Sequence, residues 1–77
     1  MKTVYIAAFQ DDVTKSKWYW FDAVNPLNMD IQRAVTLPKE VWLKAPGVVD
    51  GWTKICEIQQ NEDGSYDEST LKEVTDE

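Results

Sequence analysis

Apolar and polar positions alternate in two segments near the start of the chain, as is typical of β-strands. Residues 2–10 are rich in β-branched and aromatic types, and apolar residues occupy both their even and their odd positions. Residues 17–24 alternate in the same way, and the intervening residues 11–16 are mostly polar. The length of that connection suits a hairpin. The pattern therefore predicts an N-terminal antiparallel β-hairpin whose first strand is apolar on both faces.

The middle of the chain lacks this alternation and indicates short helices. An Asn-Pro pair at residues 25–26 ends the second strand, because proline lacks a backbone N–H and restricts the residue before it. Residues 28–37 have capping side chains near their start and apolar residues three and four positions apart, which predicts a short helix. Pro38 suits the first turn of a second helix, which the Ala-Pro-Gly sequence at 45–47 would end.

Alternation returns at residues 52–59, which predict a third strand. The sequence Asn-Glu-Asp-Gly at 61–64 then favours a tight turn, since glycine readily adopts a positive φ angle. Residues 65–67 could return as a short strand. The last nine residues, 69–77, contain only two apolar side chains. We expect these nine to form an acidic, mobile C-terminal tail.

Together these elements predict one small domain of the α+β class. An antiparallel sheet is expected from the N-terminal hairpin and the strand at 52–59, with one or two short helices packed on one face. Residues 1–68 would form this compact unit, which is small enough that folding removes only about 60% of the surface of the unfolded chain. Nine aromatic side chains are many for so small a core. Some of them are therefore candidates for an exposed binding surface.

The charges divide the chain into two unequal parts. Its 14 acidic and 8 basic residues give a net charge of −6. Residues 57–77 hold eight of the acids and a single base, Lys72, a net −7, and the other 56 residues hold six acids and seven bases, a net +1. A concentrated negative charge can steer a basic partner into contact. Direct binding of nucleic acid is not expected, because the phosphates would be repelled by the acidic region.

Several kinds of chemistry lack the residues that they need. The chain has no histidine and one cysteine, Cys56, which excludes an internal disulfide, a Cys–His catalytic pair and a Cys/His zinc site. Asp11 and Asp12 are adjacent, so an extended backbone points them apart. The three glycines form no phosphate-binding motif. We therefore expect no catalysis, no cofactor and no metal, with Cys56 a small buried residue of the third strand.

The expected environment is a reducing one. The apolar run at the N-terminus is too short for an export signal, and no segment approaches the roughly 20 apolar residues that cross a bilayer. We expect a cytoplasmic protein with no membrane partner, located in the host cell if the chain is viral.

Trp18 and Trp20 are the first candidate binding residues. In a strand they point to the same face, and Tyr19 and Phe21 point to the other. One of these faces belongs to the core. The other is either covered by the middle segment or exposed to a partner, because exposed aromatic patches are uncommon in monomers.

The acidic region around the predicted turn is the second candidate. Oxygen-bearing side chains alternate through residues 61–68 and could in principle surround calcium, but the glycine is fourth rather than sixth and the flanks are extended. A solvated turn explains them better. The acids could serve solubility alone, or they could recognise a basic surface. The candidate recognition residues are Glu57, Glu62, Asp63, Asp67 and Glu68.

These observations favour a non-enzymatic, acidic protein-binding module. We expect an inhibitor from a phage or mobile element that occupies a basic, nucleic-acid-handling surface of a host protein. The alternative is a structural subunit or adaptor that docks in a larger assembly or a homodimer through its aromatic sheet face. A third possibility uses the aromatic side chains as a platform for a small ligand or carbohydrate.

Overall fold

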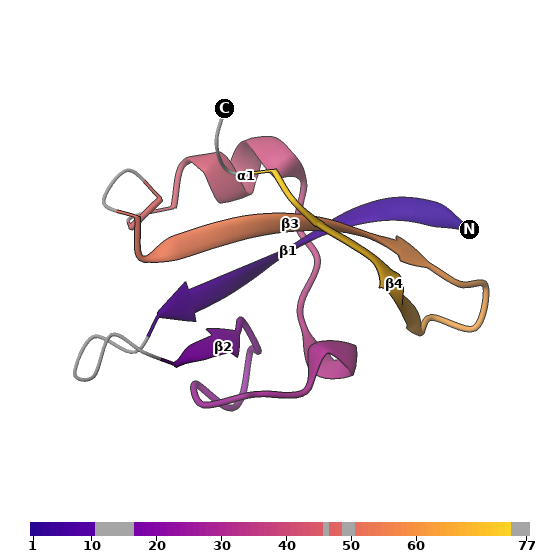
Figure 1. The fold of residues 1–77 in the computed structure, drawn as a ribbon, viewed down its shortest axis with the longest axis horizontal. Helices are drawn as coiled ribbons and strands as arrows, with labels where there is room; N and C mark the ends of the chain where they lie inside the picture. The colour runs from indigo at the N-terminus through magenta and orange to yellow at the C-terminus, as the bar shows by residue number, and fades with distance from the viewer. Residues whose placement is uncertain (11–16, 46, 49–50, 75–77) are drawn as a thin grey trace.

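A four-stranded antiparallel sheet forms the centre of the protein (Figure 1). The computed structural model describes residues 1–10, 17–45, 47–48 and 51–74. The strands lie in the order β2-β1-β3-β4, so the first and third strands of the chain are neighbours in the middle of the sheet. The strands are β1 (Lys2–Gln10), β2 (Trp18–Trp20), β3 (Thr53–Gln60) and β4 (Tyr66–Glu73).

The predicted N-terminal hairpin is confirmed, but its second strand is shorter than expected. β1 and β2 are antiparallel, with Ala8 opposite Trp20. β2 ends at Trp20 rather than at residue 24. The backbone N–H of Phe21 still donates to the Ala7 carbonyl, after which the chain turns away and the carboxylate of Asp22 accepts a hydrogen bond from the N–H of Val24. This local side-chain bond competes with strand pairing and ends it.

The middle segment forms one 3-10 turn and one short α-helix, so the described structure is mostly sheet and the helix predicted over residues 28–37 is reduced to three residues. The first is a 3-10 helix of three residues, η1 (Ile31–Arg33). Asp30 caps its N-terminus, because the Asp30 side chain accepts a hydrogen bond from the backbone N–H of Gln32 at 3.0 Å. The second, α1 (Lys39–Leu43), follows Pro38. Neither helix, nor any other in the described part of the chain, is long and apolar enough to cross a membrane.

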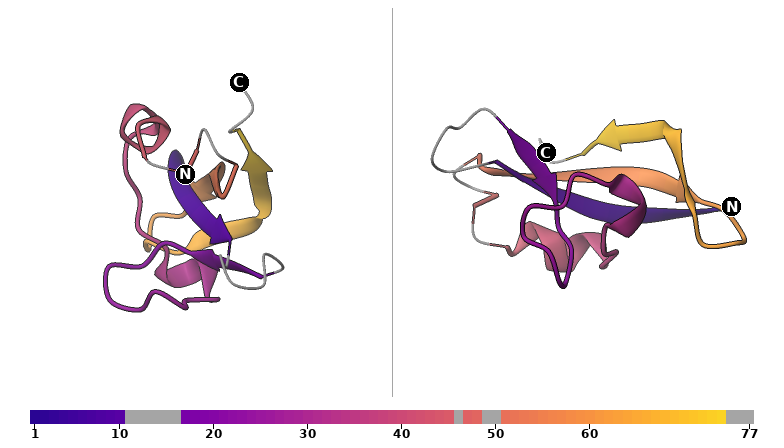
Figure 2. Two further views of the ribbon diagram at one scale, coloured as in Figure 1. Left: turned by 90° about the vertical axis from the view of Figure 1, so that its left-hand side faces the viewer. Right: turned by 90° about the horizontal axis from the view of Figure 1, so that it is seen from below.

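The two helices pack on opposite faces of the sheet (Figure 1; Figure 2, left). The expectation that they would pack on the same face is therefore wrong. Even-numbered residues of β1 point to one face and pack with η1. Odd-numbered residues point to the other and pack with α1. The η1-side cluster contains Val4, Ile6, Ile31, Ala34, Cys56, Ile58 and Tyr66. The α1-side cluster contains Ala7, Trp42 and Ile55, with Tyr5, Phe21, Val48 and Val74 packed against it.

β4 extends beyond the boundary that the sequence placed at residue 69. The strand runs to Glu73, and the N–H of Val74 then donates to the Ile55 carbonyl at 2.8 Å. Its pairing with β3 is interrupted by a large bulge, because Lys72 lies opposite Glu57 but Asp67 lies opposite Gln59. The segment 69–73 is thus held by pairing at its end, which apolar content alone did not reveal. Residues 75–77 of the expected tail, like Asp11 and Asp12, lie outside the described residues.

Candidate functional site

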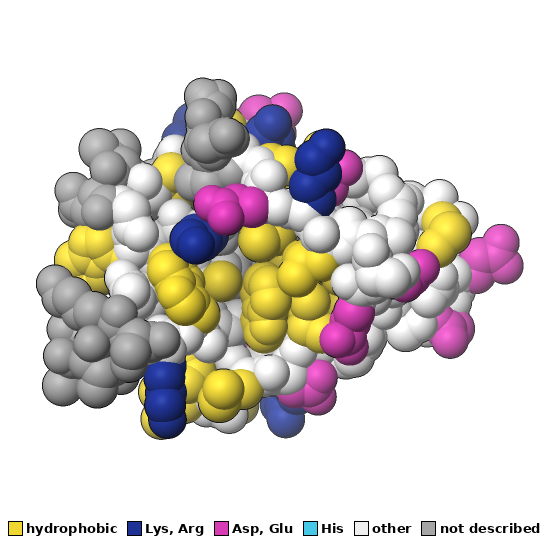
Figure 3. Space-filling model, viewed as in Figure 1, with side chains coloured by type: hydrophobic (Ala, Val, Ile, Leu, Met, Phe, Trp, Pro, Cys, Tyr) yellow, Lys and Arg dark blue, Asp and Glu magenta, His cyan; other side chains and the backbone are white. Residues whose placement is uncertain are grey.

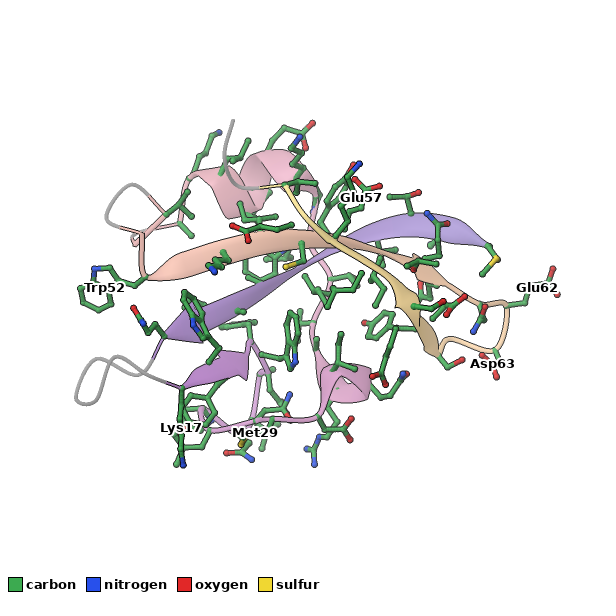
Figure 4. All side chains as sticks on the ribbon, in the orientation of Figure 1. Lys17, Met29, Trp52, Glu57, Glu62 and Asp63 are labelled. Carbon is green, nitrogen blue, oxygen red and sulfur yellow. The ribbon has the colours of Figure 1, made fainter. Side chains whose placement is uncertain are left out.

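The acidic hairpin, residues 61–68, carries four of the five acids singled out in the sequence. Gly64 has a φ angle of 93° and its N–H donates to the Asn61 carbonyl at 3.0 Å, so the predicted Asp-Gly turn is confirmed. Glu62 and Asp63 lie at the tip and point outward (Figure 4). On the face shown in Figure 3, Asp and Glu side chains gather at this end and no Lys or Arg side chain is visible there.

Two of the hairpin carboxylates are held by a repeated Asp-x-Ser arrangement. Oδ1 of Asp63 accepts hydrogen bonds from Ser65 Oγ at 2.6 Å and from its backbone N–H at 2.9 Å. Oδ1 of Asp67 accepts from Ser69 Oγ at 2.6 Å and from its N–H at 3.2 Å. The bonds from Ser65 lower the pKa of Asp63. Hydrogen bonds to the charged form thus keep this carboxylate ionised and fix its direction.

The base of the hairpin is fastened to η1. The side-chain amide of Gln32 donates to the Tyr66 carbonyl and accepts from the Tyr66 N–H, each at 2.9 Å. This two-way pairing resembles the bonding between two strands. In addition, the buried hydroxyl of Tyr66 donates to the Ala34 carbonyl at 2.6 Å. Gln32 Nε2 also donates to Glu68 Oε2 at 3.4 Å, so the acidic hairpin is positioned by four hydrogen bonds to residues more than thirty positions away in sequence.

Glu57, the fifth acid, belongs to a different surface. It lies in the middle of β3, opposite Tyr5 on one side and Lys72 on the other. Figure 4 shows it near α1, away from the labelled Glu62 and Asp63. Alternation along β3 sends its side chain to the α1 face. Glu57 is therefore placed apart from the acidic hairpin.

Trp18 and Trp20 share the η1 face, as the alternation predicts, but both are half-buried. Trp20 packs against the η1-side cluster. The ammonium of Lys54 lies 4.6 Å from the centroid of the Trp18 ring and also 3.8 Å from a carboxylate oxygen of Glu73. The two indoles are thus partly covered by the protein's own side chains.

More exposed apolar side chains lie elsewhere. Val24, Leu27 and Met29, in the loop between β2 and η1, are 80%, 64% and 67% exposed. Trp52 is 45% exposed and lies at the opposite end of the molecule from the acidic hairpin (Figure 4). The sequence placed Val24 and Trp52 at the ends of predicted strands and gave them no binding role, and Leu27 and Met29 lie in a segment without strand alternation.

The described residues contain no group of three or more His, Cys, Asp or Glu side chains that could hold a metal ion. Cys56 is buried in the η1-side cluster, as predicted. Burial, reinforced by the nearby negative charge of Glu73, raises the pKa of its thiol from 9.0 to about 11. The side chain therefore stays protonated at neutral pH and is a poor nucleophile.

We expect this thiol to make stability fall at alkaline pH. The folded state holds the proton until pH about 11, whereas the unfolded chain releases it from pH 9.0. The contribution is therefore complete below pH 9 and is lost as the pH rises toward 11. Cys56→Ala should lower the free energy of unfolding, measured with urea, by roughly 1 kcal/mol at neutral pH. In this variant the free energy of unfolding should also decrease less between neutral and alkaline pH. Equal pH dependence in the two proteins would contradict this assignment.

Comparison of the chain with protein-family models, with characterised proteins and with solved structures gave no match.

Proposed function

We propose that the protein is a non-enzymatic binding module that presents its acidic hairpin to a basic surface of a partner protein. The proposal depends on one observation: the hairpin acids lie in a stretch of sequence that contains no basic residue. No Lys or Arg occurs between Lys54 and Lys72, and the hairpin places four acids within that interval. Such a surface suits a Lys- and Arg-rich groove that otherwise binds nucleic acid. We infer that the protein is an inhibitor of phage or mobile-element origin that occupies this groove.

The fixed orientation of the hairpin carboxylates favours a role in recognition over a role in solubility alone. Solubility requires charge but no fixed direction. Here Asp63 and Asp67 are each oriented by two hydrogen bonds from a serine, and Tyr66 anchors the segment between them. Carboxylates that are already ordered lose less conformational freedom on binding. Clustered charges of one sign also speed the encounter with an oppositely charged surface.

The test begins with affinity capture on the immobilised protein, followed by mass spectrometry and kinetics with the purified partner. Neutralising the hairpin should slow association about tenfold or more at low salt, with a smaller effect on dissociation, because charges at the rim mainly steer encounter. Association of the unmodified protein should also slow steeply with salt, since the screening length is about 10 Å at 0.1 M. The hairpin variant is Glu62→Gln, Asp63→Asn, Asp67→Asn and Glu68→Gln.

A matched control removes the same number of charges from outside the hairpin. Asparagine caps a helix as well as aspartate does, so the substitution of Asp30 should leave η1 intact. Association of the control variant should stay within about threefold of the unmodified rate. Equal slowing in both variants would attribute the effect to net charge, and unchanged rates in the hairpin variant would refute the proposal. The control variant is Asp30→Asn, Glu40→Gln, Glu57→Gln and Glu73→Gln.

Assembly through an apolar surface is the second candidate. It is favoured by the exposure of Val24, Leu27 and Met29. Apolar side chains that are exposed together on the surface of a monomer often mark an interaction site. Sedimentation equilibrium distinguishes the two, since a homodimer dissociates on dilution and a free module has the mass of one chain at every concentration.

A further inference from the structure

A cavity of about 370 Å³ opens where β2 ends, in a part of the surface that the acidic-hairpin proposal does not use. Three aromatic residues line it: Phe9 from β1, Trp20 from β2 and Phe21, which follows β2 directly. Phe9 and Phe21 contact each other edge to face, with ring centroids 5.6 Å apart. The remaining lining residues come from the loop that follows and are Asp22, Ala23, Val24 and Pro26.

Asp22 places a buried negative charge in this aromatic wall. Its side chain is only 7% exposed, and its Oδ1 accepts the hydrogen bond from the Val24 N–H at 2.9 Å. Its Oδ2 is sealed from solvent and accepts no hydrogen bond. Nε of Arg33 lies 3.3 Å from Oδ2, but the Arg33 side chain is 57% exposed. The positive charge of Arg33 is therefore well solvated, whereas the carboxylate charge is not.

We propose that this aromatic pocket binds a quaternary ammonium group. Aromatic ring faces attract cations, and the attraction is strongest where the cation leaves water. The Asp22 carboxylate adds to that attraction through the low dielectric of the wall. Because Oδ2 is sealed, it offers no acceptor to a ligand at the surface of the pocket. A quaternary ammonium group needs no acceptor, whereas a primary ammonium or guanidinium would gain no hydrogen bond from this oxygen in exchange for those that it loses to water.

The ligand could come from two sources that share this chemistry. One is a free choline-type solute, and the other is a trimethylated lysine side chain on a protein. The pocket and the acidic hairpin have no residue in common. The inference therefore goes beyond the proposed function, and either can fail without the other.

The test is an NMR titration of the ¹⁵N-labelled full chain with choline. Its matched control is 3,3-dimethyl-1-butanol, the neutral carbon analogue of the same shape. Choline should shift the amide signals of Phe21, Asp22 and Val24 and should bind about tenfold more tightly than the analogue. Equal binding of the two would show a merely apolar pocket and overturn the proposal, as would the absence of shifts with choline. The same titration with a peptide that carries trimethyllysine identifies the source. Tighter binding of the peptide than of choline would indicate a modified protein, and tighter binding of choline would indicate a free solute.

Four variants, one of them a control, separate the effect of charge from that of shape. Asp22→Asn should weaken choline binding about tenfold, but it also risks loosening the loop. Arg33→Gln keeps the carboxylate and removes the competing positive charge, so it should tighten choline binding severalfold. A merely structural ion pair would not give that gain, and weaker binding in Arg33→Gln would contradict the proposal. Trp20→Leu should reduce binding, whereas Trp52→Leu, which alters a tryptophan outside the pocket, should leave it unchanged.

Discussion

Trp42→Ala is expected to remove most of the free energy of unfolding of the protein. The Trp42 side chain is 3% exposed in the α1-side cluster, and its ring lies edge to face with Phe21, with centroids 5.5 Å apart. Its indole N–H donates to the Tyr5 carbonyl at 2.9 Å. Truncation of a buried tryptophan costs roughly 3–5 kcal/mol. A domain of this size has a free energy of unfolding near the lower end of the ~5–15 kcal/mol range.

The expected loss is measured by urea unfolding followed by circular dichroism. Trp42→Phe keeps a ring in the cluster but lacks the N–H donor, so it should cost less than Trp42→Ala. Trp52→Ala is the matched control, because Trp52 is 45% exposed and should cost under about 1 kcal/mol. Similar losses from Trp42→Ala and Trp52→Ala would show that α1 contributes little to the core.

Tyr66→Ala is expected to have the second largest effect, and it should act on both stability and binding. The ring is buried in the η1-side cluster, and the hydroxyl donates to the Ala34 carbonyl. Removing both should cost roughly 3 kcal/mol. Amide exchange should show the greatest loss of protection in β4. Because Tyr66 mounts the acidic hairpin on η1, association with a basic partner should also slow, although no charge has changed.

Tyr66→Phe isolates the hydroxyl from the ring. It leaves the Ala34 carbonyl without this donor, and an unsatisfied buried acceptor costs about 1–3 kcal/mol. The hairpin should keep its place, so the association rate should match that of the unmodified protein. A rate lowered as far as in Tyr66→Ala would show that the hydroxyl, and not the packing of the ring, positions the hairpin.

Local signals account for the parts of the fold that the sequence predicted. The hairpin of β1 and β2, the turn at Gly64 and the helix after Pro38 each depend on residues that are close in sequence. Alternation also predicted the two apolar faces of β1. The extent of β4 could not be predicted in this way. It depends on pairing with β3, where Lys72 lies opposite Glu57 and the N–H of Val74 donates to the Ile55 carbonyl.

The candidate site was predictable to a similar degree. Four acids fall within one turn and its flanks, so local sequence brings them together. Glu57 was grouped with them by charge alone, although its position in β3 sends it to the α1 face. The pocket at Asp22 gave no signal, because the sequence placed residues 17–24 in one strand, whereas β2 ends at Trp20. Its burial depends on the path of the loop to η1, where Arg33 lies 3.3 Å away.

The bulge in β4 also limits how copies of this sheet can associate. An unpaired strand at the edge of a sheet is a template for further strands, and regular edges promote aggregation. Between the positions opposite Glu57 and Gln59, β4 inserts four residues, 68–71, where β3 has one. Oδ1 of Asp67 bonds to Ser69 within this stretch, so its backbone departs from a straight ladder. This irregular segment belongs to the acidic surface proposed to contact a basic partner. Its backbone N–H and C=O groups are not evenly spaced, so an incoming strand could not pair with it regularly, as fibril growth requires.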